Sequence, residues 1–202
     1  MVTLGKSRIE ALSDGVFSIA MTLLVLKLEV PEHHHSNDEM LRQLLALQPQ
    51  FVSYVVTFLI AGGFWFLHHL TFHFIRHVNG FLVWINLIFL MFVSMLPFSA
   101  GLLGHLLMHP VSQMFYIGNQ LTIALLLNLH WQYARRKGFT VETPDAGRLS
   151  FRVAHAAAIF AGCLVATILL PKYTWAAFLL VLVGGLIVEF WMWRKPHAGK
   201  AL

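Results

Sequence analysis

The chain has 202 residues, of which 58% are hydrophobic and only 11% charged, and its mean hydropathy is +0.71. Soluble domains carry about 25% charged residues, so this composition excludes an ordinary soluble protein and indicates a membrane protein. The formal net charge of +5 does not indicate nucleic-acid binding, because the basic residues lie between the apolar segments and at the chain ends. The length allows one domain, residues 1–202.

Six apolar segments reach the roughly 20 residues that a helix needs to cross a bilayer. The first lacks the basic region and small-residue cleavage site of a signal peptide, so we expect it to be retained. Gly62–Gly63 and Gly184–Gly185 are expected close-packing points between helices. We predict an all-α polytopic membrane protein with six transmembrane helices: Ser13–Val30, Pro49–Phe72, Phe81–Leu103, Val111–Tyr133, Phe151–Leu170 and Tyr173–Trp193.

The basic residues are distributed unequally between the two sides of this predicted bundle. With six spans both termini share a side, and that side would carry eleven of the 14 lysines and arginines. The other side would carry only Lys27, Arg42 and Lys172. Because cytoplasmic loops are enriched in Lys and Arg, both termini are predicted to be cytoplasmic, in a cell inner (plasma) membrane.

The first span combines polar and apolar features in an unusual way. A polar cluster precedes it, and Asp14 leads directly into the apolar helix, where a carboxylate is costly unless it is paired or hydrated. At about 100° per residue, Asp14 lies roughly 140° from Ile19, so we expect it to point back into the bundle. One helical stripe carries Gly15, Ile19, Thr22, Leu23 and Leu26. By periodicity alone this stripe could face lipid, another helix, or a pore that closes by dewetting.

The residues from Arg8 to Asp14 read R-I-E-A-L-S-D and resemble the R-x-x-x-F-S-D signature of the transmembrane protein 175 family of potassium-permeable channels. Leu12 stands where the signature has Phe. The similarity continues in Trp65-x-x-His68, in Asn86 and in Met95-Leu96-Pro97-Phe98. It implies a homotetramer in the lipid bilayer that passes K⁺ and other monovalent cations. It also implies that the chain is not an enzyme and needs no cofactor.

The resemblance further implies roles for individual residues. The first helix, about residues 13–30, would line the pore, with Ile19, Leu23 and Leu26 as the constriction and gate. Thr22 and Ser18 would contribute to ion coordination or selectivity. A structural hydrogen-bond network would hold the base of this helix, and its members would be Arg8, Ser13, Asp14, Trp65, His68 and Asn86.

The chain has no T-V-G-Y-G segment that could present a ladder of backbone carbonyls to potassium. Any selectivity must then come from side chains and pore size, and we expect only a modest preference for K⁺ over Na⁺.

Two other functions remain open. His69, His73 and His77 recur every four residues beside His68, a spacing that suits haem or metal ligation in a membrane protein. A secondary transporter would need a polar site near the membrane midplane, and the candidates are Asn86, Gln120, Asn128 and Glu189. We find no phosphate-binding glycine loop, nucleophile elbow or paired acidic residues in the spans, so a soluble-type catalytic site is not expected.

Overall fold

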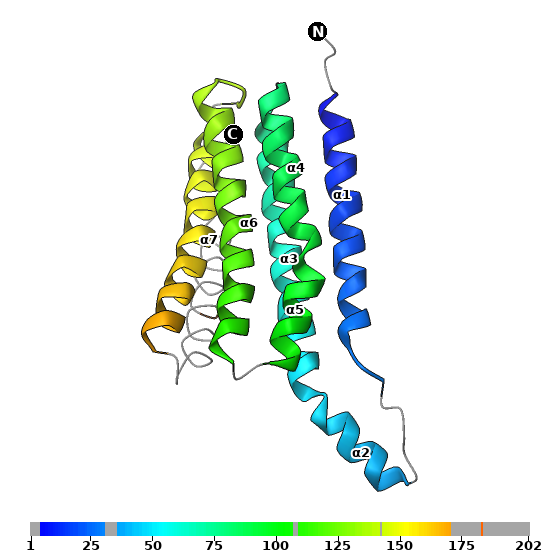
Figure 1. Ribbon diagram of the computed structural model, residues 1–202. Coiled ribbons are helices and arrows are strands. Elements are labelled where there is room, and N and C mark those ends of the chain that lie inside the picture. Colours follow the sequence, from blue (N-terminus) through cyan, green and yellow to red (C-terminus); the bar gives the residue numbers. More distant parts are fainter. Residues whose placement is uncertain (1–4, 31–35, 107–108, 142, 171–182, 184–202) are drawn as a thin grey trace, which may run out of the picture.

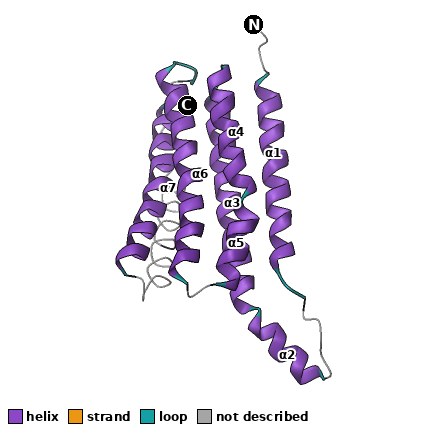
Figure 2. Ribbon diagram, in the orientation of Figure 1, coloured by secondary structure: helices purple, strands orange, loops and turns teal. Residues whose placement is uncertain are grey.

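The structure is a computed structural model, and it describes residues 5–30, 36–106, 109–141, 143–170 and 183. In these ranges the chain consists of helices and short connections, without a strand (Figure 2). The elements are α1 (Lys6–Leu23), a 3₁₀ turn η1 (Leu24–Lys27), α2 (Asn37–Ala46), α3 (Gln48–Phe74), α4 (Gly80–Ser94), α5 (Leu96–His105), α6 (Pro110–Arg136) and α7 (Pro144–Leu169).

The long helices lie side by side in one bundle, and α2 projects obliquely from one end of it (Figure 1). Helix α6 packs against α4, α5 and α7, while α1 packs against α3 and α4. Helix α1 therefore occupies one edge of the described bundle and α7 the opposite edge. This position leaves one side of α1 uncovered by the other described helices.

Local sequence signals define several helix ends. Asn79 and Thr143 cap α4 and α7 by accepting hydrogen bonds from the amides of Leu82 and Ala146. Gly138, with φ of +68°, ends α6 in the left-handed conformation that glycine adopts without steric cost. The amides of Gly138 and Phe139 donate to the Arg135 and Ala134 carbonyls, the two bonds of a Schellman motif.

Four helical segments are long and apolar enough to cross a membrane: Lys6–Lys27, Gln48–Phe74, Gly80–His105 and Pro144–Leu169. These segments overlap the first, second, third and fifth predicted spans. The first span is displaced toward the N-terminus, because α1 already begins at Lys6 and Leu28 is extended. The third is broken at Met95, where Pro97 lacks the amide that would continue the helix. The predicted sixth span lies outside the described residues apart from Val183.

The fourth predicted span corresponds to α6, which is long enough to span a bilayer but is not among these four apolar segments. Its buried polar side chains explain the lower hydropathy, and several of them are hydrogen-bonded within the bundle. The Ser112 hydroxyl donates to the Leu102 carbonyl at 2.8 Å, and the Tyr116 hydroxyl lies 3.0 Å from that of Thr57. Asn119 donates to Ser99 at 3.3 Å. Buried polar groups paired in this way suit a helix surrounded by other helices.

Candidate functional site: the first helix and its base

One face of α1 is buried and the opposite face is open. Ile9, Ser13, Phe17 and Ala20 face the bundle, at the three- and four-residue spacings of one helical face. The predicted stripe lies on the open face: the exposed fraction is 61% for Ile19, 41% for Leu23 and 72% for Leu26. The fold therefore places these three side chains on a face that no other described helix covers.

The end of α1 aligns two members of this stripe. Residues Leu24–Lys27 form a 3₁₀ turn, in which side chains three residues apart nearly eclipse. Leu23 and Leu26 are three residues apart at this transition, so they follow one another along the same side of the helix. The 3₁₀ turn was not expected from the sequence, because the apolar run continues through it unchanged.

Thr22 and Ser18 lie on the exposed side of α1 beside Ile19. The Thr22 hydroxyl oxygen lies 3.0 Å from the Ser18 carbonyl oxygen and 2.9 Å from the Ile19 carbonyl oxygen. The hydroxyl hydrogen is thus directed back to the helix backbone, and the oxygen lone pairs remain available on the exposed side.

The base of α1 is connected to α3 and α4 by a chain of buried hydrogen bonds. His68 Nε2 lies 2.9 Å from Asn86 Oδ1, and Asn86 Nδ2 donates to the Ser13 hydroxyl at 3.2 Å. The Ser13 hydroxyl in turn donates to the Ile9 carbonyl at 2.9 Å. Because the Asn86 oxygen can only accept, His68 carries its hydrogen on Nε2. Each hydrogen bond of this series is then donated in the direction of α1, from His68 to Asn86 and from Asn86 to Ser13.

Asp14 makes a separate contact with α3. Its Oδ1 accepts a hydrogen bond from the Trp65 indole nitrogen at 2.8 Å. Asp14 therefore reaches the neighbouring helix α3, as expected, but both residues are exposed on the single chain, so the contact lies at the surface of the bundle and not inside it. The reason is that Trp65 itself lies on an open face of α3. Arg8 is also exposed, and its side chain makes no polar contact with the described residues.

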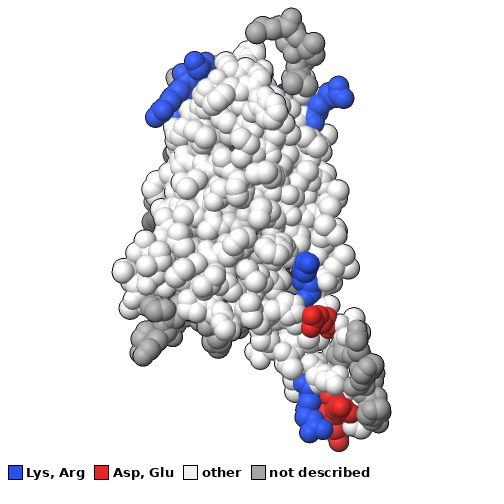
Figure 3. Space-filling view, viewed as in Figure 1, with Lys and Arg blue, Asp and Glu red and all other residues white. Residues whose placement is uncertain are grey.

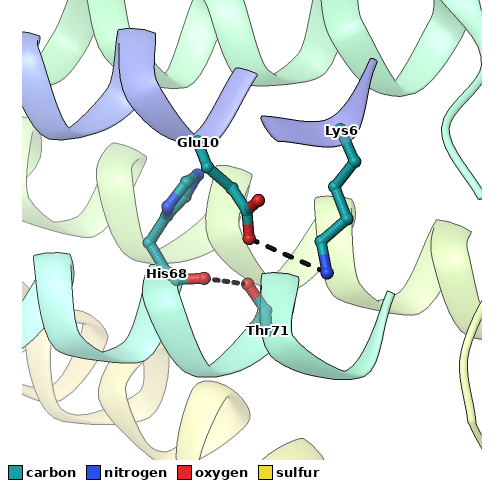
Figure 4. Close-up of polar contacts among 4 residues, drawn as sticks. All are labelled: Lys6, Glu10, His68 and Thr71. Carbon is teal, nitrogen blue, oxygen red and sulfur yellow. Dashed lines mark hydrogen bonds and ion pairs between the residues drawn. The ribbon is translucent and has the colours of Figure 1, made fainter. Parts of the chain in front are cut away.

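An ion pair that the sequence reading overlooked lies at the same end of α1. Lys6 Nζ lies 3.7 Å from Glu10 Oε1, an i,i+4 pair. Figure 4 shows this pair together with His68 and Thr71 of α3, the helix packed beside α1, where the Thr71 hydroxyl donates to the His68 carbonyl at 2.7 Å. The four-residue spacing of Lys6 and Glu10 in the sequence is the pattern that predicts this ion pair.

The histidines do not form the helical row expected from their spacing. Helix α3 ends at Phe74, so His77 lies beyond it and does not share a helical face with His69 and His73. The His69 ring stacks on Trp65, and His68 is buried between Phe72 and Phe89. The ring of His130, from α6, lies 6.1 Å from that of His68, a pairing between distant segments that the sequence pattern did not reveal. Within the described ranges no three His, Cys, Asp or Glu residues are placed to hold a metal ion.

Comparison with known proteins decides the family. A family model described as the endosomal/lysosomal potassium channel TMEM175 matches residues 8–97, which include most of α1, the Trp65–His68 pair and Asn86. Potassium channel B446_29190 of Streptomyces collinus is 33% identical over 157 residues, which are 74% of this chain and 76% of that protein. The chain belongs to the TMEM175 family.

Another TMEM175 relative, potassium channel Cha6605_3372 of Chamaesiphon minutus, is 39% identical over 132 residues. This alignment covers 63% of the chain and 64% of the relative, slightly under two thirds of the relative's length. The crystal structure of a lysosomal potassium-selective channel TMEM175 homolog from Chamaesiphon minutus superimposes with a TM-score of 0.81 and 26% identity. The superposition covers 93% of this chain and 97% of that one.

Proposed function

We propose that the chain forms a potassium-permeable cation channel in which four copies of α1 surround a central pore. The observation that carries this proposal is the open face of α1, where Ile19, Leu23 and Leu26 are exposed at the edge of the bundle. The relatives described above are named potassium channels. The number of four copies comes from the family resemblance.

The constriction would consist of stacked rings of branched apolar side chains. A narrow ring of Ile or Leu holds water poorly, so small changes in its diameter wet or dewet the path and thereby gate it. Leu23 and Leu26 extend the constriction along the axis because the 3₁₀ turn keeps them on one side of the helix.

Selectivity would come from hydroxyl oxygens next to the Ile19 ring. The Thr22 hydroxyl hydrogen is engaged by the helix backbone, so the exposed side of its oxygen can only accept, which favours a cation. Four such oxygens, with Ser18 nearby, offer a few weak ligands in place of a filter of backbone carbonyls. We therefore expect a modest preference for K⁺ over Na⁺.

We further propose six spans, cytoplasmic termini and a location in the inner (plasma) membrane. Figure 3 shows Lys and Arg at the end where α1 begins and α6 and α7 connect, above a broad surface without charged side chains. The opposite end carries Lys27 and, on α2, Asp38, Glu39 and Arg42. The end richer in basic residues is the cytoplasmic one by the positive-inside rule.

Planar-bilayer recording of the purified protein under a K⁺/Na⁺ gradient tests the function. We expect ohmic single-channel events whose reversal potential lies on the K⁺ side of zero by a modest amount. Saturating flux coupled stoichiometrically to another ion would instead indicate a transporter and contradict the proposal.

The position of the constriction is tested by Ile19→Asn in the same recordings. An amide ring would stay hydrated, so the current should rise and the preference for K⁺ should fall. Ile168→Asn is the matched control, because Ile168 is an exposed isoleucine of α7 at the opposite edge of the bundle. If Ile19→Asn leaves both current and selectivity at their wild-type values, Ile19 does not line the pore.

A further inference from the structure

A polar pocket lies at the connection between α6 and α7, at the end of the bundle where α1 begins. Its volume is about 380 Å³, within the range of about 300–1,000 Å³ typical of small-molecule sites. The pocket has no role in the proposed pore, which is built on α1. Its described lining contains one charged side chain, Arg135, with Thr140, Val141, Thr143, Pro144, Ala146 and Gly147.

Arg135 is held in position at the wall of this pocket. Its Nη1 donates to the Ser150 hydroxyl at 2.7 Å, and the Trp131 indole nitrogen donates to the same oxygen at 2.7 Å. The Ser150 hydroxyl donates in turn to the Ala146 carbonyl at 3.1 Å. One guanidinium N–H is therefore used to fix the side chain. A guanidinium has five N–H donors, and the other four make no hydrogen bond with the described residues.

The backbone of the pocket is also fixed. Thr140 forms an isolated antiparallel bridge with Ile75, through bonds from the Arg76 amide to the Phe139 carbonyl and from the Val141 amide to the Phe74 carbonyl. In such a pair the N–H of Thr140 points away from Ile75. This amide makes no hydrogen bond with the described residues, and Thr140 and Arg135 both line the pocket.

The surrounding charge favours an anion. Residues 135–152 contain five basic residues and two acidic ones, Glu142 and Asp145. The Asp145 carboxylate lies 3.6 Å from Arg148 Nη1, so it already has a basic partner outside the pocket lining. Arg binds phosphate oxygens well because its planar N–H groups can donate to two of them at once.

We propose that this pocket binds a phosphate group, with Arg135 as its principal ligand and the Thr140 amide and the threonine hydroxyls as further donors. In the orientation proposed above the pocket lies at the cytoplasmic membrane surface, where basic pockets bind the headgroups of anionic lipids. A lipid phosphodiester and free phosphate share this chemistry. The pocket stands independently of the pore, so either proposal can fail without the other.

Binding is measured on the detergent-purified full-length chain by the melting temperature. The probes are short-chain phosphatidylglycerol, short-chain phosphatidylcholine and inorganic phosphate. For wild type we expect phosphatidylglycerol at ten times its Kd to raise Tm by about 3–6 °C. Arg135→Gln should raise that Kd about tenfold or more, because it removes a charge-assisted hydrogen bond.

Arg136→Gln is the matched control, because it removes the same charge one residue along α6 from a side chain that does not line the pocket. Its Kd should stay within about twofold of wild type. Arg135→Lys keeps the charge without the planar fork and should bind with intermediate affinity. The Tm without ligand shows whether each variant is folded. If Arg135→Gln is not folded, the Kd of Arg135→Lys is used for the test.

Phosphatidylglycerol binding that depends on Arg135 and exceeds both other probes identifies a lipid headgroup. An equal, Arg135-dependent effect of inorganic phosphate identifies a soluble phosphate. An unchanged Kd in both Arg135 variants would overturn the proposal. An equal loss of affinity in Arg136→Gln would also overturn it, because it would mean diffuse attraction of the ligand to the basic surface.

Discussion

The chain of hydrogen bonds from His68 through Asn86 to Ser13 connects three helices inside an apolar surrounding. Aromatic rings of Phe17, Phe72 and Phe89 lie around the imidazole, so no solvent is available to replace a lost partner. Asn86 is central because it satisfies both neighbours at once. The polar side chains of this network therefore depend on one another for their hydrogen bonds.

Replacing Asn86 by Leu should destabilise the protein, because it leaves the buried His68 ring without its hydrogen-bond partner and removes a donor to the Ser13 hydroxyl. Leaving a buried donor or acceptor unpaired costs about 1–3 kcal/mol. Thermal or denaturant unfolding in detergent measures the loss. Asn128→Leu is the control, since the Asn128 side chain makes no hydrogen bond with the described residues, and it should change stability little. Equal losses in the two variants would show that the network does not stabilise the bundle.

At this scale the sequence predicted which residue types matter but not all of their partners. An ionisable or amide side chain in an apolar span requires a partner, which directed attention to Ser13, Asp14 and Asn86. Which partner a side chain meets depends on the rotation of each helix about its axis in the bundle, and this rotation cannot be read from the sequence. This is why Arg8, expected in the network, lies outside it, while His130 lies beside His68.

The contact between α3 and α5 depends on one glycine. A Cβ added to Gly104 would lie 3.1 Å from the Gln50 Cα, a backbone atom that cannot move without shifting α3. In contrast, a Cβ on Gly63 would meet nothing within 4 Å, and one on Gly62 only the end of Met21. The Gly62–Gly63 pair that we expect at a helix contact therefore has open space among the described residues, and Gly184–Gly185 lies outside them.

Gly104→Ala should force α3 and α5 apart and lower the free energy of unfolding by about 1–3 kcal/mol, the usual cost of overpacking. Gly63→Ala should be neutral or slightly stabilising, because alanine is the better helix former and has room there. The two melting temperatures make the comparison. Equal melting temperatures for both variants and wild type would mean that α3 and α5 are not in close contact at Gly104.

Most helices could be predicted because long apolar runs are a strong signal, whereas their interruptions were harder to place. The break before α5 has a visible cause in Pro97, although the length of the apolar run predicts one continuous span. The 3₁₀ turn after Leu23 had none, since the same residue types would also continue an α-helix. Backbone details of this kind depend on packing against neighbouring helices.

At the scale of the whole molecule, the direction in which α1 faces determines function. Its exposed stripe is apolar, and an apolar stripe is equally suited to lipid and to a closed pore. Periodicity therefore predicted the stripe but not its environment, and the fold adds that no other described helix covers it.

Cysteine cross-linking tests whether copies of α1 meet. Cys163 is buried and can be replaced by Ala, which leaves a chain without cysteine. In that background Leu26→Cys, treated with a short bis-maleimide in native membranes, should give species of two or more chains on a denaturing gel. Ile168→Cys, at the opposite edge of the bundle, should give far less. A purely monomeric Leu26→Cys product would place the stripe against lipid.

The bridge between Ile75 and Thr140 restricts the movement of the α6–α7 connection, in contrast to a free loop. Two main-chain bonds attach it to the segment that follows α3, so it cannot swing without breaking them. Hydrogen exchange at the Arg76 and Val141 amides therefore requires a local opening event, although both residues lie between helices. The bridge thus attaches the connection that precedes α7 to the C-terminal end of α3, although α3 and α7 are far apart in the sequence. A displacement of one of these helix ends should therefore be passed to the other.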